Sequence, residues 1–335
     1  MITIYIQGKD GIIETESVIK GCWINVRNVD KDDLNRLEHK FGIDSELLTD
    51  IMDIDEQARL EKEDEYTGII VRIPIYDDSQ EIPFFTMPLG IILFSDKIVT
   101  ICQKSSDALD DILLKNRVKG FSICNQNTFV LNLLGRAAFT FLKFLKEVNK
   151  RTNTIKDELQ RSIRNNELIQ LLSLQKSLVY FTTSIKSNEL LLEKLQKSPI
   201  IRFKEEEQEL LEDVLIENRQ AIEMANIYSS ILTGTMDAFA SVISNNLSIV
   251  MKQLTIISIV MMIPTLIYSF FGMNVSFPFR TDSVITAFII MGGSLFASVF
   301  GAILLSTRHR QSKKLLTPRD KQRKRSQPFS KPSRP

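Results

Sequence analysis

Two long stretches without a charged residue lie close together near the C-terminal end of this 335-residue chain. Residues 254–271 (LTIISIVMMIPTLIYSFF) form the first, and residues 284–305 (VITAFIIMGGSLFASVFGAILL) form the second. A helix rises about 1.5 Å per residue, so helices of this length match a hydrocarbon core of about 30 Å. Helices buried in a large soluble core have a similar composition. The short linker GMNVSFPFRTDS between the two stretches favours a membrane hairpin instead.

The distribution of charge predicts the orientation of this hairpin. Residues 306–335 hold eleven Lys or Arg and one acid, so the tail carries +10. Because the formal net charge of the whole chain is +1, the remaining residues carry −9. Basic residues beside a span remain in the cytoplasm. We therefore expect a multi-pass protein of the cytoplasmic membrane with both chain ends in the cytoplasm and residues 272–283 outside.

Several classes of protein are disfavoured by composition. Three cysteines are too few for a disulfide framework or a Cys-rich zinc site. We expect no enzyme, because no Ser/His/Asp, Cys/His or paired-carboxylate constellation stands out, and no GxxxxGK[ST] loop is present for ATP. The N-terminal MITIYIQGKDG lacks the pattern of a cleavable signal peptide. The basic tail adjoins a span, so we expect it to contact anionic lipid of the bilayer and no nucleic acid.

Residues 1–126 are expected to form a cytoplasmic α/β domain. The segments DKDDLNRLEHKFG and DSELLTDIMD have helical apolar spacing and begin with Asp or Ser candidates for the N-cap. Strand-like runs of apolar or alternating residues occur at Ile2–Ile6, Cys22–Val26, Gly68–Tyr76, Leu89–Phe94 and Lys97–Gln103.

The remainder of the chain is expected to be helical. Residues 127–203 have long Leu, Ile and Phe stripes between charged residues, which predict long cytoplasmic helices. From Lys204 to Phe271 only two helix breakers occur, so a single helix of about 100 Å is expected there. We divide it into a stalk, residues 204–248, and a first membrane helix, residues 249–271. A second membrane helix at 284–305 and the basic tail at 306–335 follow.

A polar stripe follows one face of this long helix. Its residues are spaced alternately by four and three positions, which keeps them on one side of a supercoiled helix. Such a stripe permits close helix packing in a membrane. It equally suits a water-lined pore built from several copies of the helix, and its extension to Asp237 favours this reading. The stripe comprises Asp237, Ser241, Ser244, Ser248, Met251, Thr255, Ser258, Met262, Thr265 and Ser269.

The order of these elements, with Gly272-Met273-Asn274 at the outer end of the first span, resembles the CorA family of magnesium transporters. The resemblance covers essentially the whole chain and implies a funnel-shaped homopentamer. It implies that Gly272, Met273 and Asn274 form a selectivity filter in which neutral oxygens hold a hydrated ion. Mg²⁺ dehydrates reluctantly, so a ring of neutral oxygens suits the hydrated ion.

The resemblance also implies that the first spans of the five subunits line the pore. Met251 and Leu254 would form an apolar constriction that gates by dewetting. The implied pore-lining residues are Ser244, Ser248, Met251, Leu254, Thr255, Ser258, Met262, Thr265 and Ser269.

Regulatory cation sites between adjacent cytoplasmic domains are a further implication of the resemblance. Asp77 and Asp213 are the best matches, and Asp237 is a third candidate. Mg²⁺ bound there would hold the assembly closed, and low cytoplasmic Mg²⁺ would open it. A solvated surface charge is the alternative for each of these acids.

The sequence leaves two other functions open. The same fold can carry Co²⁺, Ni²⁺ or Zn²⁺, although softer metals favour imidazole or thiolate and neither His39 nor His309 lies on the stripe. A membrane-anchored coiled-coil scaffold is the second alternative.

The external loop departs from many relatives of the family, because it has no acid before Asp282 and contains Arg280.

Overall fold

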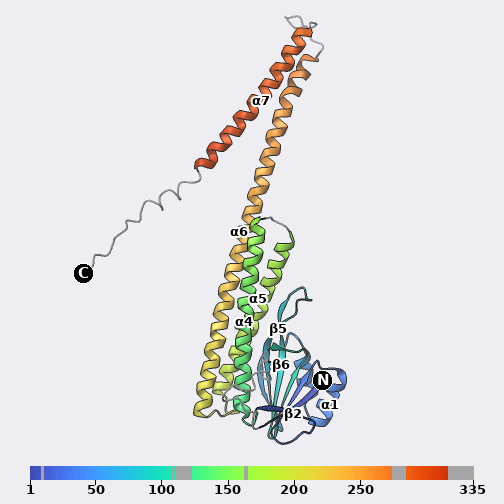
Figure 1. Cartoon of the computed structure of the whole chain (residues 1–335), viewed down its shortest axis with the longest axis vertical. Helices are drawn as coiled ribbons and strands as arrows, with labels where there is room; N and C mark the ends of the chain where they lie inside the picture. Colours follow the sequence, from blue (N-terminus) through green and yellow to red (C-terminus); the bar gives the residue numbers. More distant parts are fainter. Residues whose placement is uncertain (9–10, 108, 111–122, 162–164, 274–283, 316–335) are drawn as a thin grey trace, which may run out of the picture. The chain divides into compact units, whose positions relative to one another are not determined.

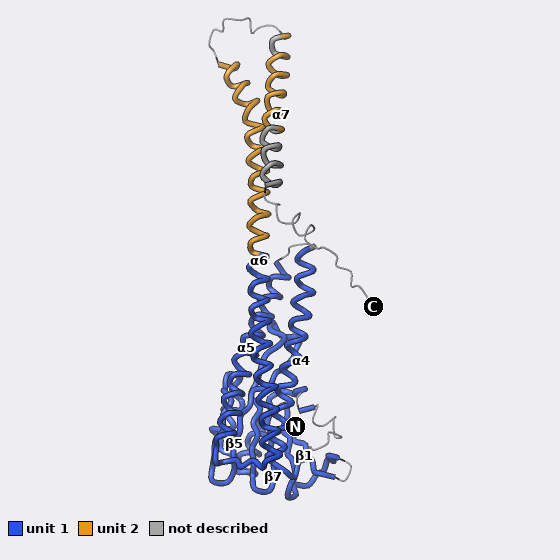
Figure 2. The backbone as a smooth tube through the Cα atoms, turned by 90° about the vertical axis from the view of Figure 1, so that its left-hand side faces the viewer, with its two compact units in different colours: residues 1–239 blue, residues 240–335 orange. Residues whose placement is uncertain are grey.

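A computed structural model describes the chain from Met1 to Leu315, except for residues 9–10, 108, 111–122, 162–164 and 274–283. The chain forms two compact units, Met1–Phe239 and Ala240–Pro335 (Figure 2).

Within the described residues, the first unit contains a seven-stranded sheet in the order β2-β1-β3-β7-β6-β5-β4. Neighbouring strands are antiparallel except β3 and β7, which run parallel. The strands are β1 (Ile2–Gln7), β2 (Ile12–Thr15), β3 (Cys22–Arg27), β4 (Arg59–Lys62), β5 (Tyr66–Tyr76), β6 (Phe84–Phe94) and β7 (Lys97–Cys102).

The five strands expected from the sequence are confirmed as β1, β3, β5, β6 and β7. Strand β6 begins at Phe84, five residues earlier than expected, and pairs with β5 along its whole length. Strands β2 and β4 were not predicted. Each has four residues and lies at an edge of the sheet, where one side of the strand faces no neighbour and the apolar pattern is weak.

Two short helices, both expected from the sequence, cover one face of the sheet. Helix α1 (Lys31–Phe41) is capped by Asp30, whose carboxylate accepts a 2.7 Å hydrogen bond from the Asp33 N–H. Helix α2 (Ser45–Met52) is capped by Asp44, which accepts from the Glu46 N–H at 3.1 Å. Apolar residues of both helices pack on the inner strands in one cluster, which includes Leu37, Leu47, Leu48, Ile51, Ile24, Ile70 and Ile92.

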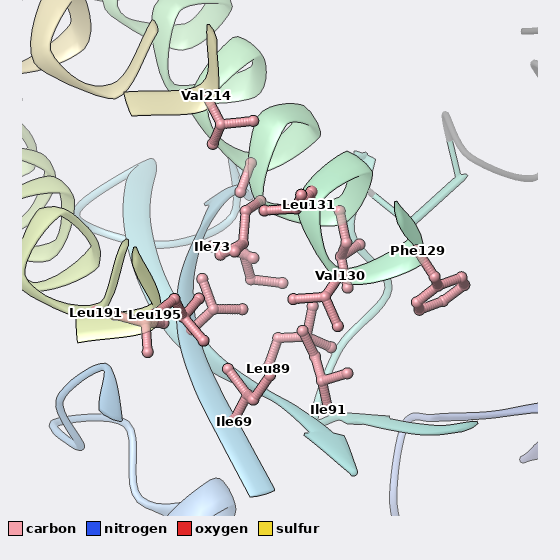
Figure 3. Close-up of a cluster of buried hydrophobic side chains, with 14 of the residues drawn as sticks. Ile69, Ile73, Leu89, Ile91, Phe129, Val130, Leu131, Leu191, Leu195 and Val214 are labelled. Carbon is pink, nitrogen blue, oxygen red and sulfur yellow. The ribbon is translucent and has the colours of Figure 1, made fainter. Parts of the chain in front are cut away.

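Long helices cover the opposite face (Figure 1). They are α4 (Gln126–Arg161), α5 (Asn165–Lys197) and the first part of α6 (Glu205–Phe271). Successive residues of a strand point to opposite faces, so Ile69 and Ile73 face these helices while Ile70 faces α2. Figure 3 shows side chains of β5 and β6 gathered with Val130 and Leu131 of α4, Leu191 and Leu195 of α5, and Val214 of α6.

A buried polar cluster joins α5 to β5. Strand β4 pairs with β5 as far as Ile70, and two residues further the Asn188 side chain takes the place of a neighbouring strand. Its amide accepts from the Arg72 N–H at 2.9 Å and donates to the Arg72 carbonyl at 2.8 Å. The Arg72 guanidinium donates to Thr86 Oγ1 at 2.7 Å and to the Glu56 carbonyl at 2.8 Å. Burial lowers the pKa of this guanidinium.

The second unit comprises residues 240–271 of α6 and helix α7 (Val284–Leu315). Helix α6 is continuous over 67 residues and contains Pro264. By length and composition, two of the described helices are able to cross a membrane. One lies in α4 and is mostly buried in the core, whereas the apolar stretch of α6 has no fully buried residue. Helix α7 holds a shorter apolar stretch, Phe288–Gly301, so the second span remains a prediction.

Candidate functional site

Two contacts show which side of α6 faces α7 inside the second unit. The hydroxyl of Ser294 lies 2.9 Å from the hydroxyl of Tyr268. At Gly301, an added Cβ would lie 3.4 Å from Cδ1 of Ile263, so the two helices approach closely there. The half-buried residues of this part of α6 follow one side of the helix: Ile249, Ile256, Val260, Ile263, Pro264, Ile267 and Phe271.

The predicted polar stripe lies outside this half-buried face. All nine predicted pore-lining residues, from Ser244 to Ser269, are exposed in the single chain. Met251, Leu254 and Met262 are 55%, 56% and 64% exposed. Between residues 254 and 267, the other exposed positions of the helix are apolar, for example Ile257 and Leu266. Lys252 and Gln253 are exposed just before this stretch. Hydroxyl groups are therefore concentrated on one strip of a helix whose remaining surface is suited to lipid or to packing.

Four hydroxyls of the stripe donate their protons within the helix, each to the carbonyl four residues earlier. Ser248 donates to Ser244 at 3.0 Å, Thr255 to Met251 at 2.9 Å, Ser258 to Leu254 at 2.9 Å and Thr265 to Met261 at 3.0 Å. A hydroxyl has one proton and two acceptor lone pairs. With the proton engaged, the outward side of each oxygen is an acceptor, which suits a cation or the hydrogens of its water shell.

The predicted filter tripeptide begins where α6 ends. The Gly272 N–H donates to the Tyr268 carbonyl at 2.9 Å, and the Met273 N–H donates to the Phe270 carbonyl at 3.4 Å. A Cβ at Gly272 would lie 3.1 Å from the Tyr268 carbonyl oxygen, so a larger residue would crowd this turn. Asn274 lies outside the described residues. The filter therefore stays a prediction.

Asp77 lies directly after β5 and already has three donors. Its Oδ1 accepts from the Ser79 N–H at 3.1 Å and from Ser79 Oγ at 2.6 Å. Its Oδ2 accepts from the Lys104 ammonium at 3.0 Å. These bonds, with Ser79 first and Lys104 second, lower the pKa of the Asp77 carboxyl to about 2. The carboxylate is thus ionised at neutral pH and bound to a cation of its own chain.

Asp213 lies on a different element, on the exposed surface of α6. It lines a groove of about 240 Å³ between α4 and α6 together with Arg136 and Glu217. Burial raises the pKa of Glu217, the nearby Arg136 opposes this shift, and Asp213 adds to it. This groove does not include Asp77.

Asp237 is exposed on α6 within the first unit. In the part of the chain that the structure describes, no three His, Cys, Asp or Glu residues lie together as a metal site would require. The predicted regulatory acids therefore do not form one metal site within a single chain. Their assignment to sites between subunits remains a prediction.

Sequence patterns did not predict Lys104 as a partner of Asp77, nor the contact between Tyr268 and Ser294. Lys104 is 27 residues from Asp77 and meets it only because β5, β6 and β7 are adjacent in the sheet. Tyr268 and Ser294 are 26 residues apart on two helices. Neither pair follows a periodic pattern that sequence reasoning detects.

Comparison with known proteins identifies the family of this chain. The family described as CorA-like Mg²⁺ transporter protein matches residues 20–308. The chain belongs to this family. It is therefore an ion-transport protein of membranes, in a family of transporters rather than enzymes.

Individual CorA relatives support this membership. The cobalt/magnesium transport protein CorA of Methanocaldococcus jannaschii is 24% identical over 287 residues, which cover 83% of this chain and 89% of the relative. The protein with the same description from Thermotoga maritima is 22% identical, over 75% of this chain and 72% of the relative. The complete structure of the M. jannaschii CorA magnesium transporter matches with a TM-score of 0.76 at 21% identity, covering 93% of this chain and 98% of that one. This likeness shows a CorA fold with an α/β domain and long helices.

Proposed function

We propose that this chain conducts divalent cations, with Mg²⁺ as the principal cargo, through a pore lined by several copies of α6. The exposed stripe of hydroxyl oxygens carries this proposal. Ser248, Thr255, Ser258 and Thr265 have their protons bonded within the helix, so they offer acceptors to a passing hydrated cation. Membership of a Mg²⁺ transporter family supports the same cargo.

The proposed pore requires self-association, because one hairpin of two helices encloses no lumen. The assembly is a homopentamer in the cell membrane, with the cytoplasmic units and the basic tail inside. The stripe residues of five α6 helices face a common axis. Met251 and Leu254 form its narrow apolar section, where water leaves when the pore closes.

Selection takes place at the outer end of the pore. Backbone carbonyls of Gly272 and side-chain oxygens of Asn274 accept hydrogen bonds from the water shell of Mg²⁺, which the ion gives up reluctantly. Neutral oxygens release the ion again, because they bind it less tightly than a ring of carboxylates. The membrane potential drives influx: a charge of +2 gains about 4.6 kcal/mol per 100 mV.

Cytoplasmic Mg²⁺ regulates this pore at acids that meet between subunits. Carboxylate oxygens are suitable ligands for Mg²⁺, and Asp77, Asp213 and Asp237 are all at least partly accessible in the single chain. A bound ion screens the repulsion between acidic cytoplasmic bodies and favours the closed assembly.

Co²⁺ is a second candidate cargo. Both CorA relatives compared above are described as cobalt/magnesium transport proteins. The stripe offers no imidazole or thiolate, so it has no ligand that prefers Co²⁺ over Mg²⁺. Passage as a hydrated ion is the route that remains. Cobalt hexammine, which cannot shed its ligands, should then compete with both metals.

The test is Mg²⁺ uptake by proteoliposomes that contain the purified full chain and an internal Mg²⁺-sensitive dye. Asn274→Ala should reduce uptake about tenfold or more, since losing one acceptor costs about 1–3 kcal/mol. Asn226→Ala, at an exposed asparagine of α6 in the first unit, serves as the control and should transport normally. Absence of uptake by the unmodified chain would contradict the proposal and favour the scaffold alternative.

A further inference from the structure

Two adjacent carboxylates at the end of β5 are each paired with a cation of the same chain. Asp77 is paired with Lys104 at 3.0 Å, and Asp78 is paired with Arg151 at 3.2 Å. Asp77 is also the residue proposed above as a ligand of regulatory Mg²⁺. A metal ion that approaches it therefore meets an ammonium group already in place.

The ammonium of Lys104 is held from two sides. It bonds to Oδ2 of Asp77, and it lies 5.3 Å from the centre of the Phe85 ring, a distance at which a cation is attracted to the ring face. The other carboxylate oxygen is engaged by the two Ser79 donors. Most of the acceptor capacity of Asp77 is thus taken up within the chain.

The two cations differ in how readily they leave. Arg151 lies over the rings of Tyr76 and Phe84, at 4.9 and 5.2 Å from their centres, and donates to the Tyr76 hydroxyl at 2.6 Å. Its planar group is fixed by several contacts at once. Lys104 is a point charge on a flexible stem, and its side chain is 45% exposed. The Asp77 carboxylate is therefore the exchangeable one of the pair.

We propose that Lys104 is a tethered competitor of the divalent cation at Asp77, so that it sets how much cytoplasmic Mg²⁺ is needed to occupy this carboxylate. The proposal rests on the regulatory role proposed for Asp77. An ammonium and a divalent cation repel each other strongly when both contact one carboxylate. Binding of Mg²⁺ then requires Lys104 to swing into solvent, which lowers the affinity for the metal.

The experiment is a Mg²⁺ titration of the purified full chain in detergent by isothermal titration calorimetry. Lys104→Met removes the charge but keeps an apolar stem beside Phe85. At this partly exposed position, loss of the repulsion should tighten Mg²⁺ binding about tenfold. Lys104→Arg restores the positive charge and should return the affinity toward that of the unmodified chain.

Lys143→Met provides a matched control. Lys143 also pairs with an aspartate, Asp107, at 2.8 Å, and its ammonium lies 5.6 Å from the Phe144 ring centre. This variant loses a comparable ion pair away from Asp77 and should bind Mg²⁺ like the unmodified chain. Equal tightening in Lys143→Met and Lys104→Met would overturn the proposal, because a general change in net charge would then account for both.

The Asp77→Asn variant distinguishes two claims: that Asp77 binds Mg²⁺, and that Lys104 competes with Mg²⁺ for it. If Asp77→Asn weakens Mg²⁺ binding but Lys104→Met leaves it unchanged, Asp77 is a ligand and Lys104 does not compete, which refutes the inference alone. If Asp77→Asn has no effect on the titration, the regulatory role of Asp77 is wrong and the inference fails with it.

Discussion

The hydroxyl oxygen of Ser294 in α7 lies 2.9 Å from the phenolic oxygen of Tyr268 in α6, and Ser294 is only 1% exposed. Four residues further along α7, Ser298 is also buried, and Gly301 approaches Ile263. Small residues on α7 thus let the two helices of the second unit pack closely. Because this contact fixes the side of α6 that faces α7, it leaves the polar stripe of α6 exposed and able to line the proposed pore.

Replacement of Ser294 should destabilise the hairpin. Ser294→Leu places a larger side chain in a buried contact and should cost about 1–3 kcal/mol, as overpacking does elsewhere. The expected result is a lower midpoint of thermal unfolding for the detergent-solubilised chain. Phe296→Leu is the control, because Phe296 is 73% exposed two residues away. An unchanged midpoint for Ser294→Leu would show that the helices do not pack as described.

Asn188 should be one of the most sensitive positions of the first unit. Asn188→Leu leaves the N–H and C=O of Arg72 without the bonds that the amide provides. Two buried backbone groups without partners should together cost about 2–4 kcal/mol. Urea unfolding of the full chain in detergent, followed by tryptophan fluorescence of the buried Trp23, measures this loss. Leu190→Ala, at a 69% exposed position of the same helix, should change it little, and equal effects would contradict the role given to Asn188.

The cysteines should differ sharply in reactivity. Burial raises the pKa of the Cys102 thiol to about 11 and also raises that of Cys22, whereas Cys124 is exposed. Ellman's reagent at pH 8 should therefore modify one thiol per native chain and three after denaturation. Modification of Cys102 in the native chain at the rate of Cys124 would contradict its burial.

The same shift predicts a pH dependence of stability. The folded chain holds the Cys102 proton more tightly than the unfolded chain does, so this stabilisation is complete below the unfolded-state pKa. It is lost progressively as the pH rises toward about 11. Cys102→Ala should flatten the decline of the unfolding midpoint above about pH 9. A decline that is identical in both proteins would assign the alkaline sensitivity to other groups.

Much of the fold follows from periodic patterns in the sequence. The apolar run GIIVRIPIY predicts β5, and Asp30 and Asp44 mark the starts of α1 and α2, because each signal depends on neighbours in the chain. With only Gly234 and Pro264 as helix breakers, residues 204–271 predict the long α6. Strands β2 and β4 escape this reasoning, since a four-residue edge strand such as RLEK has little apolar periodicity.

Sequence patterns predict only part of the candidate site. The spacing of Ser244 to Ser269 predicts a stripe on one helix face, but nothing in it reveals which face packs on α7. Pairs such as Asp77 with Lys104 or Asn188 with Arg72 join residues that only the tertiary fold brings together. Oligomeric contacts involve surfaces of other chains, so they lie beyond both the sequence patterns and the single chain.

The central claim is that ions pass along the polar stripe of α6. Thr265 is exposed on the stripe, and Ile263, two residues away, is half-buried beside Gly301. Each is replaced by cysteine in a chain that carries Cys124→Ser, and Mg²⁺ uptake into proteoliposomes is measured before and after treatment with a positively charged thiol reagent. Uptake through Thr265→Cys should be lost on modification, while uptake through Ile263→Cys should persist. Undiminished uptake through fully modified Thr265→Cys would show that the stripe is not the path of the ion.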